Sequence, residues 1–428
     1  MQARAEVTGR YAHQYVVASK KVKGQILDEV VGVTGWSRDN ARRRLVAADR
    51  GSLTVSSRKS GYRTKQPVRR ARKRRARKYG YDTLRVLVRV WTASGKQCGK
   101  YLVVVMGLLL DNLERHGELV FGADHYSPQV RCELLSMSAA TIDRYLAPTK
   151  TGGRLKGIST TKPSPLLRNS IRVRKAGDEV EAEPGFFEVD TVAHCGPTTR
   201  GEYARTLNMT DVLVGWTFTR SIRNNARVHI QWALQQAHDL LPYPLAGVDF
   251  DNGSEFINHD IVGWAVGLDL FFTRSRPHKK NDQATIESKN GHLVRRYADY
   301  WRYDTPETLQ LLNQMWPLVN DLLNYLTPTK KPIGWDVLGG GKKKRVYDTP
   351  TTPLDRLLRA GILSPAQQQE LNAYRDNLNP ADLVRRIRRI QIKLAKLGAP
   401  RTEQLRRTLR EPTPINVQTG IILRTTTE

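Results

Sequence analysis

The spacing of apolar residues divides the chain into a helical first part, a central part in which strands alternate with helices, and a mostly helical last part. In residues 1–57, apolar side chains from Ile26 to Val31 recur at the intervals of an amphipathic helix. A glycine-containing break at 32–35 follows, and Ser37 can cap a second helix. Two helices joined by a short turn predict a helix-turn-helix unit, with an ordinary helical hairpin as the alternative.

A second helical segment covers residues 81–148. Near its end, two leucines precede a turn, and Ser138 can cap a further helix, so the pattern predicts a second helix-turn-helix unit. The connecting segments differ in composition. Residues 58–80 are rich in arginine and lysine, whereas residues 149–183 are rich in glycine, serine, threonine, proline and lysine, which is typical of a linker.

The central part, residues 184–326, contains short runs with strand-like composition and longer runs with helical spacing. The strand-like runs lie at 185–192, 204–212, 215–222, 245–250 and 268–275. The helical runs lie at 226–241, 255–267 and 283–301. Three strands followed by alternating helices and strands predict a mixed five-stranded sheet flanked by helices, which is an α/β domain.

The last part, residues 327–428, is basic and mostly helical in pattern. It contains the sequence LGGGKKKR, which is typical of a flexible basic joint. Residues 380–397 predict a helix that is capped by Asn379 and ended by Gly398. Apolar residues spaced by three and four form a seam along this helix. The seam can pack onto the same chain or contact a second protomer, and the sequence leaves both interpretations open.

The charge balance indicates a polyanionic partner. The chain has 70 lysines and arginines against 41 aspartates and glutamates, a formal net charge of +29. Nucleic acid is favoured over an anionic membrane surface, because no apolar run reaches the roughly 20 residues of a membrane span and no apolar signal segment is present at the N-terminus. Three cysteines that are far apart argue against a disulfide framework or a cysteine-rich zinc module. We therefore expect a cytoplasmic protein that binds double-stranded DNA.

Basic residues gather in three places where contact with DNA is expected. The second helix of the first unit turns arginines outward, the linker at 58–80 can follow a phosphate backbone, and further cations flank the helix predicted at 283–301. Solvated charged surfaces or a localisation signal are the alternatives. The predicted contacts are Arg38, Arg42, Arg43, Arg44, Arg72, Arg74, Arg75, Lys279, Lys280, Lys289 and Arg295.

Three acidic residues stand out against this basic background. Asp190 lies in the first predicted strand, Asp251 follows the fourth, and Glu287 lies in the last central helix. The first and fourth strands can be neighbours in such a sheet, which would bring their acids to one edge. Three ionised carboxylates repel each other unless a divalent cation balances them. Oxygen ligands favour Mg²⁺ or Mn²⁺, and two such ions roughly 4 Å apart can promote displacement at phosphorus.

Asp249 is the main competitor of Asp251. It lies two residues earlier and would share the same face of an extended strand. The Asp-Asn-Gly context favours Asp251 as the second acid of the site.

These motifs resemble the catalytic core of retroviral-integrase-like DDE transposases. The sequence VDT around Asp190, DNGSEF from Asp251 and NDQATIESKN around Glu287 match the three acidic motifs of this class. The second and third acids are separated by 35 residues, which is the spacing of the class. The stretch TRSRPHKKNDQATIESKNGHLVRRYADYWRYD is similar to a group of bacterial insertion-sequence transposases, as are ILDEVVGVTGWSRDNARRRL and RVYDTPTTPLDRLL in the flanking parts.

The resemblance implies an RNase H-like fold for the central domain and a bacterial, nucleoid-associated protein. It implies that Asp190 bridges two Mg²⁺ or Mn²⁺ ions and that Asp251 and Glu287 each complete one site. The reaction of the family is cleavage that frees a 3′-hydroxyl, followed by transfer of that hydroxyl to target DNA. The active form would be a homo-multimer that pairs two DNA ends, and a helper ATPase is an open question.

Two departures from the family pattern affect this interpretation. Ala284 stands where the third motif often has glycine, and Lys289 lies two residues after the acid, whereas retroviral integrases place lysines just after it. The alternatives are an RNase H-like nuclease without strand transfer and a catalytically silent DNA-binding regulator from a decayed element.

Overall fold

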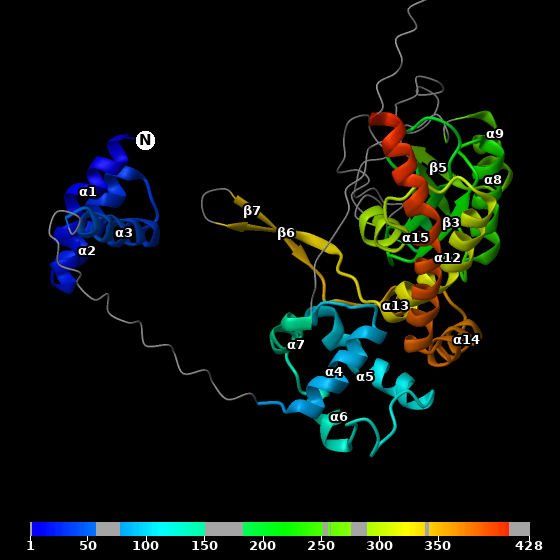
Figure 1. Ribbon diagram of the computed structural model, residues 1–428, viewed down its shortest axis with the longest axis horizontal. Helices are drawn as coiled ribbons and strands as arrows, with labels where there is room; N and C mark the ends of the chain where they lie inside the picture. Colours follow the sequence, from blue (N-terminus) through cyan, green and yellow to red (C-terminus); the bar gives the residue numbers. More distant parts are fainter. Residues whose placement is uncertain are drawn as a thin grey trace, which may run out of the picture. The chain divides into compact units, whose positions relative to one another are not determined.

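The computed structural model describes residues 2–56, 78–149, 183–250, 256, 258–274, 289–338 and 342–410 (Figure 1). The chain forms two compact units, Met1–Ala76 and Arg77–Glu428. Within the described residues, no helix is both long and apolar enough to cross a membrane.

The first unit consists of three helices, α1 (Gln2–Val17), α2 (Lys20–Thr34) and α3 (Arg38–Ser56). Val30 of α2 and Ala41 and Leu45 of α3 are completely buried, so the predicted inward faces of the two helices are confirmed. Gly35 adopts a left-handed conformation (φ 67°), and its N–H donates to the Val31 carbonyl. This turn ends α2 and lets α3 begin three residues later.

The second unit begins with a helical block. It contains α4 (Tyr81–Ala93), α5 (Gly99–Arg115), α6 (Pro128–Leu135), α7 (Ala139–Leu146) and the 3-10 turn η1 (Ala147–Thr149). Trp91, Met106 and Leu134 belong to the hydrophobic core of this block. The Ser138 hydroxyl accepts the Thr141 N–H at 3.3 Å, so the predicted cap of the last helix is confirmed.

The centre of the second unit is a mixed five-stranded sheet, as predicted. Its strands are β1 (Phe186–Ala193), β2 (Arg205–Asp211), β3 (Thr217–Ile222), β4 (Gly247–Phe250) and β5 (Phe271–Arg274), in the order β3-β2-β1-β4-β5. The first three strands are antiparallel, and β4 and β5 join in parallel. The first and fourth strands are therefore neighbours, as the sequence indicated.

Helices surround this sheet. They are α8 (Arg227–Leu240), α9 (His259–Gly267), the π-helical turn η4 (Asn290–Val294), α11 (Arg295–Ala298) and α12 (Pro306–Leu326). α12 covers the outer edge of β3, where Asn313 bonds to the backbone of Ser221 and Asn324 bonds to that of Thr217. These two amides satisfy edge groups that would otherwise be open to another strand.

The helix predicted at 283–301 ends earlier than expected. Its first part lies outside the described residues, and the helical conformation stops at Ala298. Asp299 has a positive φ of 54°, and the chain then reverses so that the Tyr303 N–H donates to the His194 carbonyl. The carbonyl of Tyr303 accepts the Ala204 N–H at 2.7 Å. Pairing with the ends of β1 and β2 therefore replaces the last helical turn.

The C-terminal region contains a two-stranded sheet and three helices. These are β6 (Pro332–Leu338), β7 (Lys342–Tyr347), α13 (Pro353–Arg359), α14 (Pro365–Asp376) and α15 (Pro380–Arg410). The expected basic joint is wrong for the residues of LGGGKKKR that lie in β7, because they pair with β6 in an antiparallel register. A single strand pairing is enough to convert this polar segment into regular structure.

The predicted helix at 380–397 is confirmed at its start but continues to Arg410. The Asn379 side chain accepts the N–H of Ala381 and of Asp382, as expected for a cap. Gly398 does not end the helix, because a β-carbon there would lie 2.7 Å from the Tyr303 ring. The glycine provides room for Tyr303 to pack against the helix.

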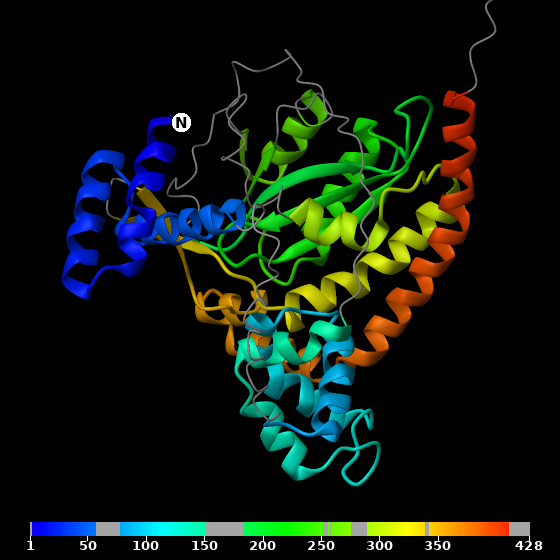
Figure 2. The ribbon, with the colours of Figure 1, turned by 60° about the vertical axis from the view of Figure 1, so that its left-hand side comes forward.

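The apolar seam of α15 packs onto its own chain. Leu383, Ile387 and Leu394 are buried in the same core as α12, and Figure 2 shows α15 running alongside α12. Of the two open interpretations, the structure supports packing within the chain.

Gly398→Ala should lower the free energy of unfolding by about 1–3 kcal/mol, because the new methyl group collides with Tyr303 and Trp301. Chemical denaturation of the variant and the wild type measures the change. Gly263→Ala in α9 is the matched control, since nothing lies within 4 Å of its β-carbon position and the substitution favours the helix by about 0.5–1 kcal/mol. Equal stability of the Gly398→Ala variant and the wild type would contradict this account of the packing.

Candidate functional site

The carboxylate of Asp190 is fixed from two directions. Asp190 lies half-buried in β1 and faces Asn208 of β2 in the antiparallel register. One of its oxygens accepts the Thr191 N–H at 2.6 Å. The other accepts the side-chain amide of Asn290 at 2.6 Å. Hydrogen bonds to the charged form of a carboxylate stabilise that form, so this geometry favours an ionised Asp190.

Asn290 connects three separate elements. It begins the π-helical turn η4, donates to Asp190, and accepts the side-chain amide of Asn208 at 2.9 Å. Asn208 and Asp190 are direct neighbours in the sheet, so the three side chains close a small network. Asn290 was not among the site residues predicted from the sequence. Its position three residues after Glu287, about one helical turn, is the signal that could have indicated it.

Two further acids lie on the same face of the sheet. Glu188 and Asp249 are paired in the parallel register of β1 and β4, and both are buried. The Thr273 hydroxyl donates to Asp249 at 2.6 Å. Burying carboxylates is costly unless hydrogen bonds or cations compensate for their charge. From the sequence, Asp249 is the main competitor of Asp251, and Glu188 is interpreted as a strand-face residue. The burial of both residues is a feature that the sequence did not reveal.

Several buried oxygen atoms on the sheet face that carries Asp190 have no donor among the described residues. The Asn208 side-chain oxygen is buried and has no hydrogen-bond partner in the described part of the chain, and the same is true of the hydroxyl oxygens of Thr210 and Thr219. All three residues lie on the face that carries Asp190. A buried acceptor without a donor is costly, and a cation or a water molecule would satisfy it. This set of oxygen donors fits Mg²⁺ or Mn²⁺ better than Zn²⁺.

The other two predicted acids, Asp251 and Glu287, lie outside the described residues. β4 ends at Phe250, which pairs with Val189, the neighbour of Asp190. The helical conformation resumes at Lys289. The described residue before Asp251 therefore pairs with the neighbour of Asp190, and Asn290, three residues after Glu287, is hydrogen-bonded to Asp190. Among the described residues, no group of three histidine, cysteine, aspartate or glutamate side chains could hold a metal ion.

The predicted DNA contacts of the first unit lie on one helix. Arg38, Arg42, Arg43 and Arg44 are exposed on α3. Arg38 forms an ion pair with Asp28 of α2, and Arg44 stacks over the Trp36 ring at 4.6 Å. The guanidinium of Arg43 donates to the backbone of its own helix. Contacts within the first unit therefore hold three of these four arginine side chains in place.

The remaining predicted DNA contacts divide into described and undescribed residues. Lys289 is partly buried, with its ammonium nitrogen 3.5 Å from the Gly215 carbonyl. Burial, together with the nearby Lys331 and Arg356, lowers the pKa of Lys289 to about 7. Arg295 donates to the Ala193 carbonyl at 2.8 Å. Contact of these two residues with DNA stays a prediction. The others, Arg72, Arg74, Arg75, Lys279 and Lys280, lie outside the described residues.

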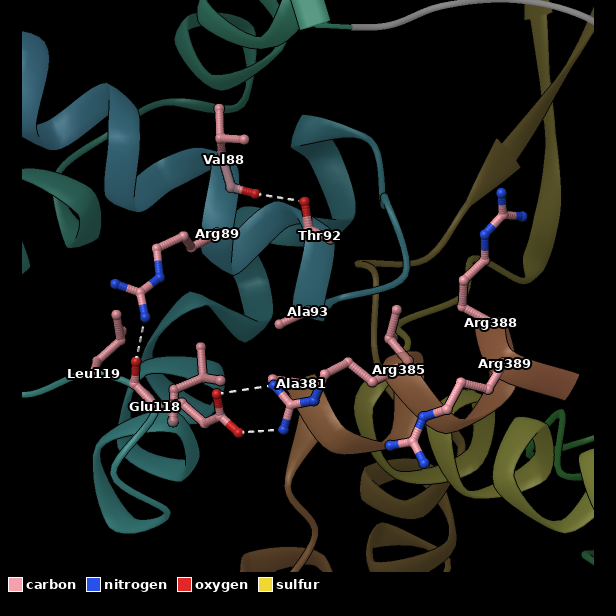
Figure 3. Close-up of a pocket in the computed structure, with 12 residues that line it drawn as sticks. Val88, Arg89, Thr92, Ala93, Glu118, Leu119, Ala381, Arg385, Arg388 and Arg389 are labelled. Atoms are coloured by element: carbon pink, nitrogen blue, oxygen red, sulfur yellow. Dashed lines mark hydrogen bonds and ion pairs between the residues drawn. The ribbon is translucent and has the colours of Figure 1, made fainter. Parts of the chain in front are cut away.

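A groove of about 550 Å³ lies between α4 and α15 and contains none of the predicted site residues (Figure 3). Its floor is apolar and includes Val88 and Leu113, and four arginines lie at its rim. Glu118 crosses the groove: Arg385 of α15 donates to it at 3.0 Å, and Asn379 donates at 2.9 Å. These hydrogen bonds hold the pKa of Glu118 at about 2. The groove is a seam between the helical block and α15.

Glu118→Gln should reduce the acid sensitivity of the second unit. Because the pKa of Glu118 is lowered in the folded state, its ion pair contributes stability above about pH 4.5 that is lost as the pH falls toward 2. The contribution is about 1 kcal/mol after solvent screening is included. Unfolding measured between pH 3 and 7 should show a flatter dependence on pH in the variant.

Glu370→Gln is the control for this measurement, since Glu370 is exposed on α14 and has no hydrogen bond or ion pair within the described residues. If the stability of Glu118→Gln depends on pH as strongly as that of the wild type, other carboxylates cause the dependence.

Comparison with known proteins finds a relative that covers most of the chain. No family model matches the chain. The "Uncharacterized protein y4rM" of Sinorhizobium fredii (strain NBRC 101917 / NGR234) is 35% identical over 356 residues, which cover 83% of this chain and 95% of that protein. Among solved structures, the catalytic core domain of BIV integrase matches 44% of this chain and 98% of its own, with 15% identity and a TM-score of 0.27. That score is too low to transfer either the fold or the activity of the integrase to this chain.

Proposed function

The chain belongs to the same family as the Sinorhizobium fredii protein y4rM, and we propose that it is a DDE transposase, which cuts DNA at the ends of a mobile element and joins them to target DNA. The observation that carries the proposal is the position of Asp190. It lies on a polar sheet face, next to the strand that leads into Asp251, and its carboxylate is held by the turn that follows Glu287.

Covalent geometry supports a site built from all three acids. Consecutive Cα atoms are about 3.8 Å apart, so Asp251 follows directly on Phe250, which pairs with Val189. Glu287 precedes Asn290 by three residues, and Asn290 donates to Asp190. The described residue before Asp251 and the described turn after Glu287 thus both lie close to the Asp190 carboxylate.

Each acid has a distinct role in the proposed site. Asp190 would bridge two divalent cations, and Asp251 and Glu287 would each complete the coordination of one. Two cations held in this way would activate the attacking oxygen and stabilise the leaving oxygen on phosphorus. Asn290 would act as a positioning residue, because it orients Asp190 without contacting the reacting phosphate.

The proposed reaction consists of two in-line displacements at phosphorus. In the first, water attacks the phosphodiester at the element end, the bond to the 3′-oxygen breaks, and a free 3′-hydroxyl and a 5′-phosphate result. In the second, this 3′-hydroxyl attacks a phosphodiester of the target, a new phosphodiester forms, and a target 3′-hydroxyl leaves. The protein forms no covalent intermediate, so a single set of carboxylates can serve both steps.

Recognition of the ends would belong to the helical parts of the chain. The α2–α3 pair has the short turn and the exposed arginines that a helix-turn-helix unit requires, with Arg42 and Arg43 directed to solvent. The α6–α7 pair in the region of 81–148 would be a second helix-turn-helix unit that recognises the DNA ends. Joining two ends to one target requires at least two copies of the chain, so the active form would be a homo-multimer assembled on DNA.

Strand transfer is the activity that tests the proposal. The protein, Mg²⁺ or Mn²⁺, a pre-cut labelled DNA end from the element that carries the gene, and a supercoiled plasmid should yield plasmid joined to the label. Asp190→Asn, Asp251→Asn and Glu287→Gln should each reduce joining to background, because each removes a charged cation ligand.

Asp269→Asn is the control, since Asp269 is exposed and asparagine tolerates its positive φ of 55°. Cleavage of DNA without joining would indicate a nuclease instead, and end-binding without either product, unaffected by the three substitutions, would indicate a silent regulator.

Asn290→Ala should raise the Mg²⁺ concentration that gives half-maximal joining by about 10–100-fold, since partners that orient a metal ligand contribute on this scale. Asn208→Ala should act in the same direction because it supports Asn290. Metal titration of the joining reaction, with thermal unfolding measured in parallel, checks both. A fall in joining that is the same at every metal concentration would contradict a positioning role.

A further inference from the structure

The hairpin formed by β6 and β7 stands apart from the rest of its unit. Its strands pair only with each other, and neither packs extensively against another described helix or strand. The hairpin residues whose side chains are described, such as Ile333 and Lys344, belong to none of the hydrophobic cores. In Figure 1 both strands run outward from the end of the unit at which α13 begins.

The base of the hairpin is firmly anchored. Asp348 accepts the Lys331 N–H at 2.6 Å, and its own N–H donates to the Lys331 carbonyl at 2.9 Å. Arg356 of α13 donates to the Asp348 carboxylate at 2.9 Å and to both oxygens of Thr329 at 2.6 Å. A planar guanidinium that binds three oxygens at once fixes the direction in which the strands leave the core. The hairpin is thus held at one end and unsupported along its length.

The charge of the hairpin is strongly one-sided. β7 begins with four consecutive cations, Lys342 to Arg345, whereas Asp336 is the single acidic residue in either strand. Asp336 lies opposite Lys344 in the register, so at least three positive charges have no acidic counterpart within the hairpin. Ile333 and Tyr347 add exposed apolar surface, with 66% and 48% of their areas accessible.

An isolated two-stranded sheet is at best marginally stable in water. The chain nevertheless maintains one here, with an anchored base, a cationic strand and a three-glycine connection in the sequence. An antiparallel ribbon of two strands fits the width of the major groove of duplex DNA, about 12 Å. β6 has seven residues, which at about 3.3 Å per residue make the ribbon long enough to cross that groove.

We propose that the β6–β7 hairpin is a DNA-binding arm that lies along duplex DNA and contacts its phosphates through Lys342 to Arg345. The inference rests on the proposed function, in which DNA is the substrate. It assigns a contact that is independent of the three acids and of the helical units. The arm extends the bound length of DNA, and its contribution is chiefly electrostatic.

The test replaces Lys342, Lys343, Lys344 and Arg345 by glutamine in the full chain. The affinity for a labelled duplex carrying the element end is then measured over a range of salt concentrations. Each lost phosphate contact lowers the slope of log Kd against log salt by about 0.9, so the variant should lose about 2–3 in slope and about 10–100-fold in affinity. Hydroxyl-radical footprinting should show a shortened protected region, with the remaining protection unchanged.

The matched control removes four exposed cations from α15, with Arg386, Lys393, Lys396 and Arg407 changed to glutamine. This variant has the same net charge as the hairpin variant, and it should keep both the slope and the footprint. An unchanged slope and footprint in the hairpin variant, or equal losses in both variants, would overturn the proposal. Thermal unfolding of both variants should match the wild type, because both sets of substitutions replace cations and change no apolar residue of the cores.

Failure of the arm and failure of the proposed function give different results. If the hairpin variant binds and joins DNA like the wild type, only the arm is disproved. Alternatively, the wild type binds DNA with a salt dependence that the hairpin substitutions reduce, and yet joins no ends. That result would support the DNA-binding arm and contradict the transposase proposal. Binding of duplex RNA or acidic vesicles in preference to DNA by the wild type would overturn both.

Discussion

Holding the Asp190 carboxylate in one position on the sheet is the constraint on which the candidate site in the second unit depends. Asp190 receives one hydrogen bond from its own strand and one from Asn290, which lies 100 residues later in the sequence. The network closes only when β2 is in register, because Asn208 holds Asn290. A shift of one residue in that register would turn Asn208 to the opposite face and leave Asp190 without its partner from η4.

The same constraint explains why one face of the sheet is polar. The centre of a sheet covered by helices is normally filled by apolar side chains, yet Glu188, Asp249 and several threonines are buried here. The cost of their burial is offset by hydrogen bonds such as that from Thr273 to Asp249. Elsewhere the fold gains its stability from conventional packing, with α12 and α15 supplying large apolar surfaces to one shared core.

Local patterns predicted much of this architecture. Alternating apolar residues located the five strands, and the caps Ser138 and Asn379 were visible because capping chemistry depends on a few neighbouring residues. The order of the three acids could also be read from the sequence, although the arrangement of Asp251 and Glu287 stays a prediction.

Features that depend on distant contacts could not be predicted. Glycine is common just after the end of a helix, which is why Gly398 was predicted to end one. In the structure, Gly398 makes room for Tyr303, which lies 95 residues earlier. Asn290 lies three residues after Glu287, but its bond to Asp190 depends on a strand 100 residues earlier. The basic segment in β7 becomes a strand only because β6 pairs with it. The burial of Glu188 and Asp249 follows from the sheet order, which no single segment determines.

The position of α15 has a consequence for how the protein is made. The core that contains Phe187 also contains Leu394, so it is complete only after the ribosome has added about 200 further residues, which takes about 10–40 s at typical rates of synthesis. α12 ends at Leu326, 68 residues before Leu394, so its apolar side is exposed to chaperones and proteases for about 3–14 s of that interval. A premature stop codon before Leu383 would leave it exposed permanently. The last helix thus completes the core, and a truncated copy that lacks it would expose the apolar surface that α15 covers in the full chain.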